Sequence, residues 1–180
     1  LDTANLGDSG FVVLRAGQVV YESTAQQHSF NFPYQLQYGG RDQAKDADQT
    51  TMQVAEGDLV VLGTDGLFDN LFVDDILSCI VQCGSGDEEA IAEALASLAH
   101  VKAADPTYRS PFAVEAEKAR KYFLGGKMDD ITVVVATVCS DSGKDAKAVT
   151  NVRPGNLGQA LAMRKLPAAE HSTVPLRSRL

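Results

Sequence analysis

Residues 59–70 read Leu59-Val60-Val61-Leu62-Gly63-Thr64-Asp65-Gly66-Leu67-Phe68-Asp69-Asn70, and this stretch specifies the centre of the domain. Residues 59–63 form an almost continuous apolar run, which is typical of a buried β-strand. The strand delivers Asp65 at its end, and the glycine that follows lets the backbone turn away. A carboxylate on a short stem at a strand end can hold its oxygen atoms still, and Mg²⁺ and Mn²⁺ prefer oxygen ligands. The stretch therefore predicts a sheet with a metal ligand at its edge.

Two further Asp motifs stand beside β-like runs. Asn5-Leu6-Gly7-Asp8-Ser9-Gly10 leads into one apolar run, and Gly125-Gly126-Lys127-Met128-Asp129-Asp130-Ile131-Thr132 leads into another. Asp8, Asp65 and Asp129 are far apart in the chain, yet a compact sheet can bring the three strand ends to one edge. Converging carboxylates repel one another unless a cation lies between them. The three motifs together predict a site for divalent cations.

The chemistry that such a site permits is hydrolysis of a phosphoester. Two divalent ions held about 3.5 to 4 Å apart can share a water molecule, lower its pKa and direct it at phosphorus. The chain has no Gly-x-x-x-x-Gly-Lys-[Ser/Thr] loop and no His-Glu-x-x-His helix, which excludes kinase and zincin interpretations. Taken singly, each motif has a plainer interpretation as a turn or a cap. For Lys127 we favour solvation of its loop over contact with a phosphate.

The rest of the sequence contains strand signals, then helix signals, then a last strand. The predicted strands are a hairpin of residues 10–15 and 18–23, a second strand pair of 50–54 and 59–63, and a last strand at 131–138. Three helices are predicted between the second pair and the last strand. The first covers 73–83, the second runs from the capping box 85–88 to before Pro106, and the third runs from Ser110-Pro111 to Gly125-Gly126. Residues 31–49 are predicted as a loop. This order indicates an α+β domain with helices layered on antiparallel sheets.

Bulk composition narrows the class of protein. The chain has 180 residues with 44% hydrophobic and 22% charged content, which suits one globular domain. A formal charge of −8 excludes a general nucleic-acid surface and favours a cation binder. No apolar run approaches the ~20 residues of a membrane span, so no integral membrane segment is expected. Cys79, Cys83 and Cys139 lack Cys-x-x-Cys spacing, which indicates a reducing, intracellular compartment rather than disulfides or a zinc site.

The charge changes sign towards the end of the chain. Residues 140–180 carry three acidic and seven basic side chains, a net +4, whereas residues 1–139 carry twenty-one and nine, a net −12. We expect residues 1–139 to form the domain and 140–180 to be a basic, disordered tail. Because the chain starts with Leu1 and runs at once into strand-like sequence, it is expected to be a fragment of a longer protein.

At its Asp motifs the sequence resembles the metal-dependent type 2C (PPM) Ser/Thr protein phosphatases. Their later motifs read like Asn-Leu-Gly-Asp-Ser, a strand followed by Asp-Gly-x-x-Asp, and Asp-Asp/Asn-x-Thr/Ser-Val, in the same order. Residues 25–36, 108–113 and 125–127 resemble most the branch found in mitochondria and chloroplasts. The resemblance covers residues 2–139 and implies a phosphorylated protein as substrate, with an organellar location. The oligomeric state stays open.

The resemblance also implies metal ligands. Asp65 matches the ligand of the Asp-Gly motif, and Asp129 matches the ligand ahead of the last strand; these are the predicted catalytic residues. Asp8 matches the Asp associated with a weaker third metal. The implied cofactors are two Mn²⁺ or Mg²⁺ ions, with a third at the weaker site.

Three neighbours of these ligands are expected to support them. Asp69 matches the second Asp of Asp-Gly-x-x-Asp, which holds metal-bound water, and Asp130 stands where the family often has Asn. Gly66 follows the first ligand. The implied fold is an α-β-β-α sandwich, in which two antiparallel sheets are flanked by helices.

One departure from the family matters for function. The family's first half, with an early acidic residue and an Asp-Gly whose Asp bridges both metals, has no counterpart in this sequence. We therefore expect a partial sandwich, truncated at its N-terminus and with exposed strand edges, that holds half a site, binds metal weakly and hydrolyses little or nothing alone. An inactive type 2C-like domain with a binding or regulatory role is the alternative. A cation-binding β-domain without phosphatase ancestry would require the motif order to arise by chance.

Overall fold

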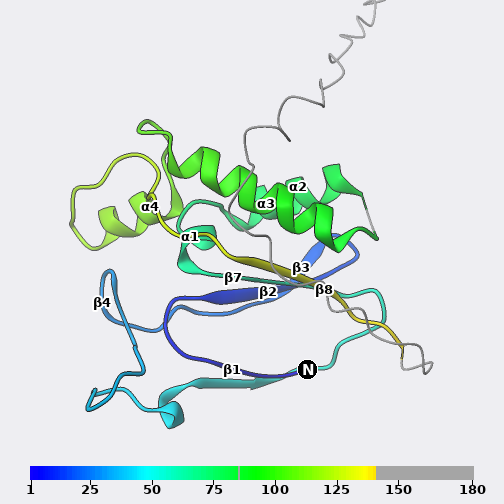
Figure 1. Ribbon diagram of the computed structural model, residues 1–180, viewed down its shortest axis with the longest axis horizontal. Helices are drawn as coiled ribbons and strands as arrows, with labels where there is room; N and C mark the ends of the chain where they lie inside the picture. The colour runs from blue at the N-terminus through cyan, green and yellow to red at the C-terminus, as the bar shows by residue number, and fades with distance from the viewer. Residues whose placement is uncertain (85, 141–180) are drawn as a thin grey trace, which may run out of the picture.

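A four-stranded antiparallel sheet forms the centre of the computed structural model, which describes residues 1–84 and 86–140 (Figure 1). Its strand order is β3-β2-β7-β8. The strands are β2 (Gly10–Arg15), β3 (Gln18–Glu22), β7 (Leu59–Gly63) and β8 (Val133–Thr137). The predicted buried strand β7 lies between β2 and β8, so both of its edges are paired.

The register of this sheet brings three chain segments together. Gly63 at the end of β7 pairs with Gly10 at the start of β2, and it also pairs with Val133 at the start of β8. The turn before β2, the segment after β7 and the loop before β8 therefore meet at one end of the sheet. These three segments carry the three predicted Asp motifs.

The predicted hairpin of residues 10–15 and 18–23 is confirmed as β2 and β3. Its two-residue loop has positive φ at both positions, 50° at Ala16 and 76° at Gly17, as a type I′ turn requires. The last residue of the predicted range, Ser23, lies just outside β3.

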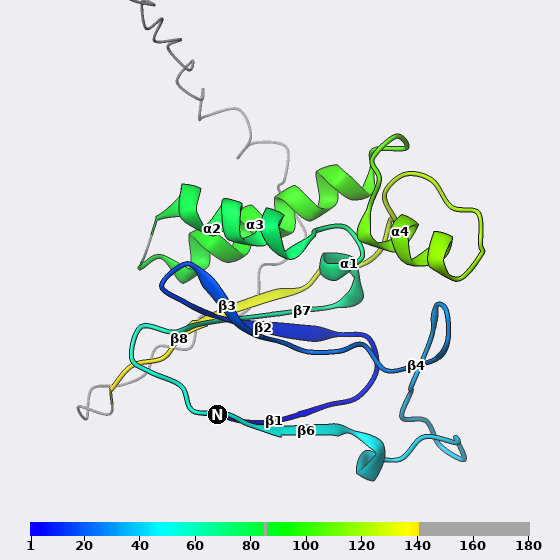
Figure 2. The same cartoon turned by 180° about the vertical axis from the view of Figure 1, so that it is seen from behind.

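The second predicted strand pair is wrong. β6 (Asp48–Thr51) pairs with β1 (Asp2–Asn5) rather than with β7. The reason is that β2 and β8 already occupy both edges of β7, whereas β1 offers a free edge in a separate layer (Figure 2). The region predicted as a loop also contains β5 (Phe32–Pro33), which pairs with β4 (Gln27–Ser29), and the short 3₁₀ helix η1 (Ala44–Asp46).

Helices cover one face of the four-stranded sheet, and the β1-β6 pair faces the other (Figures 1 and 2). The helices are α1 (Asp65–Phe68), α2 (Val73–Cys83), α3 (Glu88–Ala103) and α4 (Pro111–Lys118). The helix predicted at 73–83 is confirmed with the same bounds. None of the helices in the described part of the chain combines the length and apolar character needed to cross a membrane.

Two helix boundaries differ from the prediction. The N-cap of α3 is Asp87, whose side chain accepts a hydrogen bond from Ala90 N at 2.9 Å; Ser85 is outside the described residues. α4 ends at Lys118 instead of at the two glycines. Arg120 adopts a φ of 56°, and the amides of Arg120 and Lys121 donate to Glu117 O and Ala116 O, which together form a Schellman motif.

The apolar side chains of the sheet divide between its two faces. On the helix side, Val12, Val61 and Val135 are buried in one cluster with Leu71, which lies between α1 and α2, and with the helix residues Leu67, Ile76, Ile91 and Leu95. On the other side, Phe11, Val13 and Val60 form a smaller cluster with Tyr21, Met52 and Val138. Burial on both faces explains why β2 and β7 are apolar throughout instead of alternating.

The fold is thus a mixture of helices and antiparallel sheets, as predicted. In the described residues the helical layer lies on the outer face of the four-stranded sheet. Apart from Ser140, the predicted tail at 140–180 is outside the described residues.

Candidate active site

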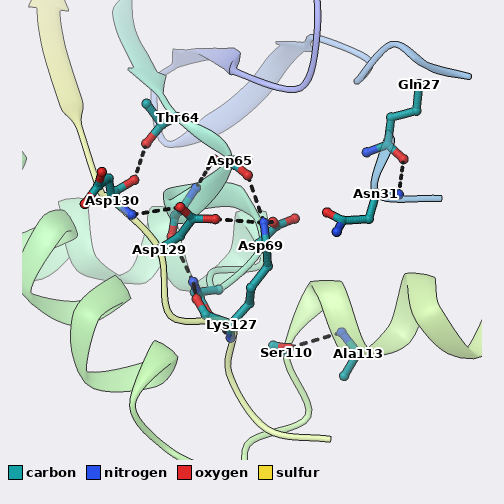
Figure 3. A network of polar contacts seen from close by, with 12 residues as sticks. Gln27, Asn31, Thr64, Asp65, Asp69, Ser110, Ala113, Lys127, Asp129 and Asp130 are labelled. Atoms are coloured by element: carbon teal, nitrogen blue, oxygen red, sulfur yellow. Dashed lines mark hydrogen bonds and ion pairs between the residues drawn. The ribbon is translucent and has the colours of Figure 1, made fainter. Parts of the chain in front are cut away.

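The three predicted ligand positions lie at the same end of the central sheet. Asp65 is the first residue of α1, two residues after β7, and its Oδ1 accepts a hydrogen bond from Gly66 N at 2.9 Å. Asp129 lies in the loop before β8, and Asp8 lies in the turn between β1 and β2. The side chains of Asp65, Asp69 and Asp129 point toward one another in Figure 3. We refer to these three residues as the carboxylate cluster.

The side chain at the centre of the carboxylate cluster is Lys127. Its Nζ donates to Asp65 Oδ2 at 2.8 Å and to Asp69 Oδ2 at 2.7 Å, and it lies 2.9 Å from Asp129 Oδ2. Only 16% of this lysine side chain is exposed. The interpretation of Lys127 as a residue that solvates its loop is therefore wrong. Sequence reasoning missed this role because two of the three partners, Asp65 and Asp69, lie 62 and 58 residues earlier in the chain, although the quoted motif already contained Lys127 and Asp129.

Asn70 fixes the backbone of Lys127. It is fully buried, and its Nδ2 donates to Gly66 O at 2.9 Å and to Lys127 O at 2.8 Å, while its Oδ1 accepts from Lys127 N at 2.9 Å. The side chain thus joins α1 to the loop before β8. This role was not predicted, although Asn70 ends the quoted stretch of residues 59–70. A buried amide with every bond directed at backbone is a positioning residue.

Gly66 and Thr64 hold the same two segments together at a second point. A Cβ on Gly66 would lie 2.5 Å from Asp130 O, so any side chain there would collide with the backbone. Thr64 Oγ1 donates to Asp130 O at 3.0 Å and accepts from Thr132 N at 3.0 Å. The close approach explains why glycine follows Asp65. Asp130 takes part through its backbone carbonyl, and its side chain is exposed.

Electrostatics within the site are uneven, because negative charge exceeds positive charge. Burial raises the pKa of Asp69 to about 6, although the Lys127 hydrogen bond opposes this. Burial, and next the charge of Asp65, raise the pKa of Asp8. The hydrogen bond from Lys127 lowers the pKa of Asp129. Burial lowers the pKa of Lys127 itself, but the hydrogen bonds that its ammonium donates to the carboxylates outweigh burial and raise that pKa above its ordinary value.

The donor atoms of the carboxylate cluster suit a hard cation, but their spacing suits an ammonium. In residues 1–84 and 86–140, no three His, Cys, Asp or Glu side chains are arranged to ligate one ion. The oxygen atoms lie 2.7 to 2.9 Å from Lys127 Nζ, whereas Mg²⁺ takes oxygen ligands at about 2.0 to 2.1 Å. The carboxylates would have to close by several tenths of an ångström around a metal. Ligation by Asp8, Asp65 and Asp129 stays a prediction.

A cavity of about 800 Å³ opens beside the carboxylate cluster, and Asp8 and Asp69 both line it. Four phenylalanines, Phe11, Phe30, Phe68 and Phe112, are among the residues that line it. The Phe112 ring stacks edge-on against Phe123 at 4.7 Å, and Lys127 Nζ lies 5.1 Å from the centre of the Phe112 ring. Of the carboxylate cluster, Asp69 lines this cavity, which is large enough for a peptide side chain and its neighbours.

Known proteins similar to this chain are protein phosphatases. This chain is 43% identical over 143 residues to "Probable protein phosphatase 2C 55" of Arabidopsis thaliana, and the match covers 78% of this chain and 31% of the relative. It is 43% identical over 149 residues to "Protein phosphatase PTC7 homolog" of Homo sapiens, covering 77% of this chain and 49% of the relative. No family model matches.

A solved structure shares the fold. The photosystem II phosphatase PBCP superposes with a TM-score of 0.70 at 38% sequence identity, covering 76% of this chain and 58% of that chain. The chain spans between about a third and a half of the length of the curated relatives described above. These similarities agree with the motif order in the sequence, and the chain belongs to the type 2C family of protein phosphatases.

Proposed function

We propose that this chain is the C-terminal part of a metal-dependent type 2C phosphatase domain, and that the whole protein hydrolyses phosphoserine and phosphothreonine in proteins. One observation carries the proposal. The register of β2, β7 and β8 brings Asp8, Asp65 and Asp129 to one end of a sheet, beside a cavity, in a chain whose relatives are named protein phosphatases.

In the proposed mechanism, Asp65 and Asp129 would hold Mn²⁺ or Mg²⁺, and Asp8 would contribute to a weaker third site. Two bound divalent ions supply an activated water and neutralise the phosphoryl oxygens. Asp69 would hold metal-bound water in place, and Gly66 allows α1 to approach the backbone of Asp130. The cavity lined by Asp8 and Asp69 would admit the phosphorylated residue, with phenylalanine rings on its apolar side.

The chain by itself is proposed to be a poor catalyst. A bridging carboxylate normally shared by both metals belongs to the family's first half, which has no counterpart in this sequence, and no described carboxylate stands in for it. Weak metal binding and slow hydrolysis by residues 1–180 follow from this. The complete domain is proposed to be an α-β-β-α sandwich in which further strands extend the β1-β6 layer.

The test is hydrolysis of p-nitrophenyl phosphate with Mn²⁺, Mg²⁺ or EDTA. Residues 1–180 and the full-length protein are assayed as wild type, Asp65→Asn and Asp129→Asn, with Asp48→Asn on exposed β6 as the matched control. Metal-dependent turnover by the full-length protein that both cluster variants abolish and the control retains supports the proposal. Absence of turnover in full-length wild type would favour the inactive alternative.

We also propose a mitochondrial or chloroplast location for the full-length protein. The support is the resemblance of residues 25–36, 108–113 and 125–127 to the organellar branch, together with similarity to a phosphatase described as acting on photosystem II. Fractionation of cells that produce the tagged full-length protein tests this location. Recovery in the cytosolic fraction would contradict it.

A further inference from the structure

Lys127 has more anionic partners than a structural ion pair needs. Its ammonium lies within 2.9 Å of carboxylate oxygens from the start of α1, the end of α1 and the loop before β8. One positive charge therefore serves three negative ones. Asp8 adds a fourth negative charge near enough to influence the same groups.

We propose that Lys127 is a tethered cation that holds the carboxylate cluster together when no metal is bound, and that a divalent ion must displace it. The inference rests on the proposed function, in which Asp65 and Asp129 ligate that ion. Lys127 is thus a positioning residue that opposes metal binding and preserves the geometry of the empty cluster.

Shared oxygen atoms make displacement necessary. Lys127 Nζ contacts Oδ2 of Asp65 and Oδ2 of Asp129, the side chains that the metal would use. An ammonium at hydrogen-bond distance from these atoms would stand beside a doubly charged ion, where like charges repel strongly in a partly buried site. The two cations therefore compete for the same carboxylates.

The structure allows the ammonium to leave without rebuilding the site. Asn70 holds the backbone N and O of Lys127, so the loop stays in place. The lysine stem has four flexible carbons, and its end already lies near the ring of Phe112 at the cavity wall. A rotation of the side chain toward the cavity releases the carboxylates.

The first experiment compares Lys127→Met with Lys45→Met, an exposed lysine of η1, in residues 1–180. Calorimetry measures the Kd for Mn²⁺, and melting in EDTA measures stability without metal. Lys127→Met is expected to bind Mn²⁺ at least tenfold more tightly and to melt several degrees lower in EDTA, because the cluster loses its counter-ion. Lys45→Met should match wild type in both. Lys127→Arg, which keeps the charge, should keep the weak Mn²⁺ binding.

The second experiment uses wild type, so that it does not depend on the variant folding. Acetic anhydride labels lysine amines, and mass spectrometry quantifies each site. Lys127 should be protected in EDTA and become several-fold more reactive with Mn²⁺, while Lys45 reacts equally in both conditions.

Equal or weaker Mn²⁺ binding by folded Lys127→Met overturns the inference, as does labelling of Lys127 that ignores Mn²⁺. Failure of the proposed function is a separate result. It shows as full-length turnover that survives Asp65→Asn and Asp129→Asn, or as no turnover at all. If Mn²⁺ binds to none of the variants, including Lys127→Met, the competition does not exist and the inference fails, whatever the full-length protein does.

Discussion

The two ends of strands β2 and β7 differ in how the negative charge of their buried carboxylates is balanced by positive charge. At one end, Arg15 meets Asp58 in a bidentate pair, with Nε to Oδ1 at 2.7 Å and Nη2 to Oδ2 at 2.6 Å. Asp58 is 1% exposed and also accepts from Ala55 N at 2.8 Å. At the other end, the single ammonium of Lys127 faces the carboxylate cluster.

This difference in charge balance distinguishes a structural ion pair from a candidate cation-binding site. Hydrogen bonds from Arg15 and then from Ala55 lower the pKa of Asp58 to about 2, so this carboxylate is fully satisfied. Burial instead raises the pKa of Asp69 to about 6, in a cluster where charge is left uncompensated. A balanced pair stabilises the fold, whereas an excess of carboxylates creates affinity for a further cation.

The largest expected effect comes from removing a cluster carboxylate in the full-length protein. Asp65→Asn or Asp129→Asn should lower kcat/KM by a factor on the order of 100 or more, because each removes a proposed metal ligand. Neither should lower the Tm much, since the cluster already carries excess negative charge. Metal-dependent kinetics measure the expected loss of kcat/KM, and thermal melting of the same samples measures the expected small change in Tm. Near-normal kcat/KM in either variant would contradict the comparison.

Asp58→Ala is expected to do the reverse. It leaves the amide of Ala55 without its acceptor and breaks a bidentate pair, so the Tm should fall by about 5 °C or more. Specific activity of the folded full-length protein should be unchanged. Glu117→Gln breaks the exposed pair with Arg109, whose side chains are 71% and 70% exposed, and should shift the Tm by less than about 1 °C. Equal Tm shifts in Asp58→Ala and Glu117→Gln would show that the buried ion pair stabilises the fold no more than the exposed one.

Asn70→Ala should affect both the stability of the fold and the binding of Mn²⁺. It deletes three hydrogen bonds to backbone atoms of Gly66 and Lys127. The expected loss in the free energy of unfolding is on the order of 2 to 4 kcal/mol. Because Lys127 then loses its fixed backbone, Mn²⁺ affinity should change as well. Urea unfolding and calorimetry measure the two effects, and a stability loss with unchanged Mn²⁺ binding would show that Asn70 acts on the fold alone.

The two ends of the strands also differ in how the stability of the protein depends on pH. With a folded-state pKa near 6 and an unfolded value of 3.8, Asp69 binds more protons when folded. In EDTA its contribution to stability therefore falls as pH rises from about 4 to about 6, by no more than about 3 kcal/mol. Asp69→Asn should abolish this fall, and Asp48→Asn should retain it. Urea unfolding at several pH values measures how the free energy of unfolding changes with pH. An Asp69-dependent rise in this free energy between about pH 4 and pH 6 would contradict the prediction.

Asp58 acts in a different window. Its folded-state pKa of about 2 is below its ordinary value of 3.8, so its stabilisation is present above about pH 4 and is lost as pH falls toward 2. The two ends of the same strands therefore respond to acid with opposite signs.

Local sequence determined most of the elements and the positions of the candidate ligands. The apolar run before Asp65 predicted β7, the Ala16-Gly17 turn predicted the hairpin, and the helix at 73–83 followed from its periodicity and the glycine that ends it. Each of these signals lies within a few residues of the element that it specifies. Motif order alone also indicated the family, which the similar proteins confirm.

Only the tertiary structure decided which segments meet. β6 pairs with β1 because both edges of β7 are taken, and no local pattern reports which edges are free. α4 ends early because Arg120 adopts a left-handed φ, which its residue type does not predict. Lys127 lies among three carboxylates because Asn70 and the register of the sheet bring distant segments together. Its contacts with Asp65, Asp69 and Asn70 join residues more than fifty positions apart, and sequence periodicity carries no information at that range.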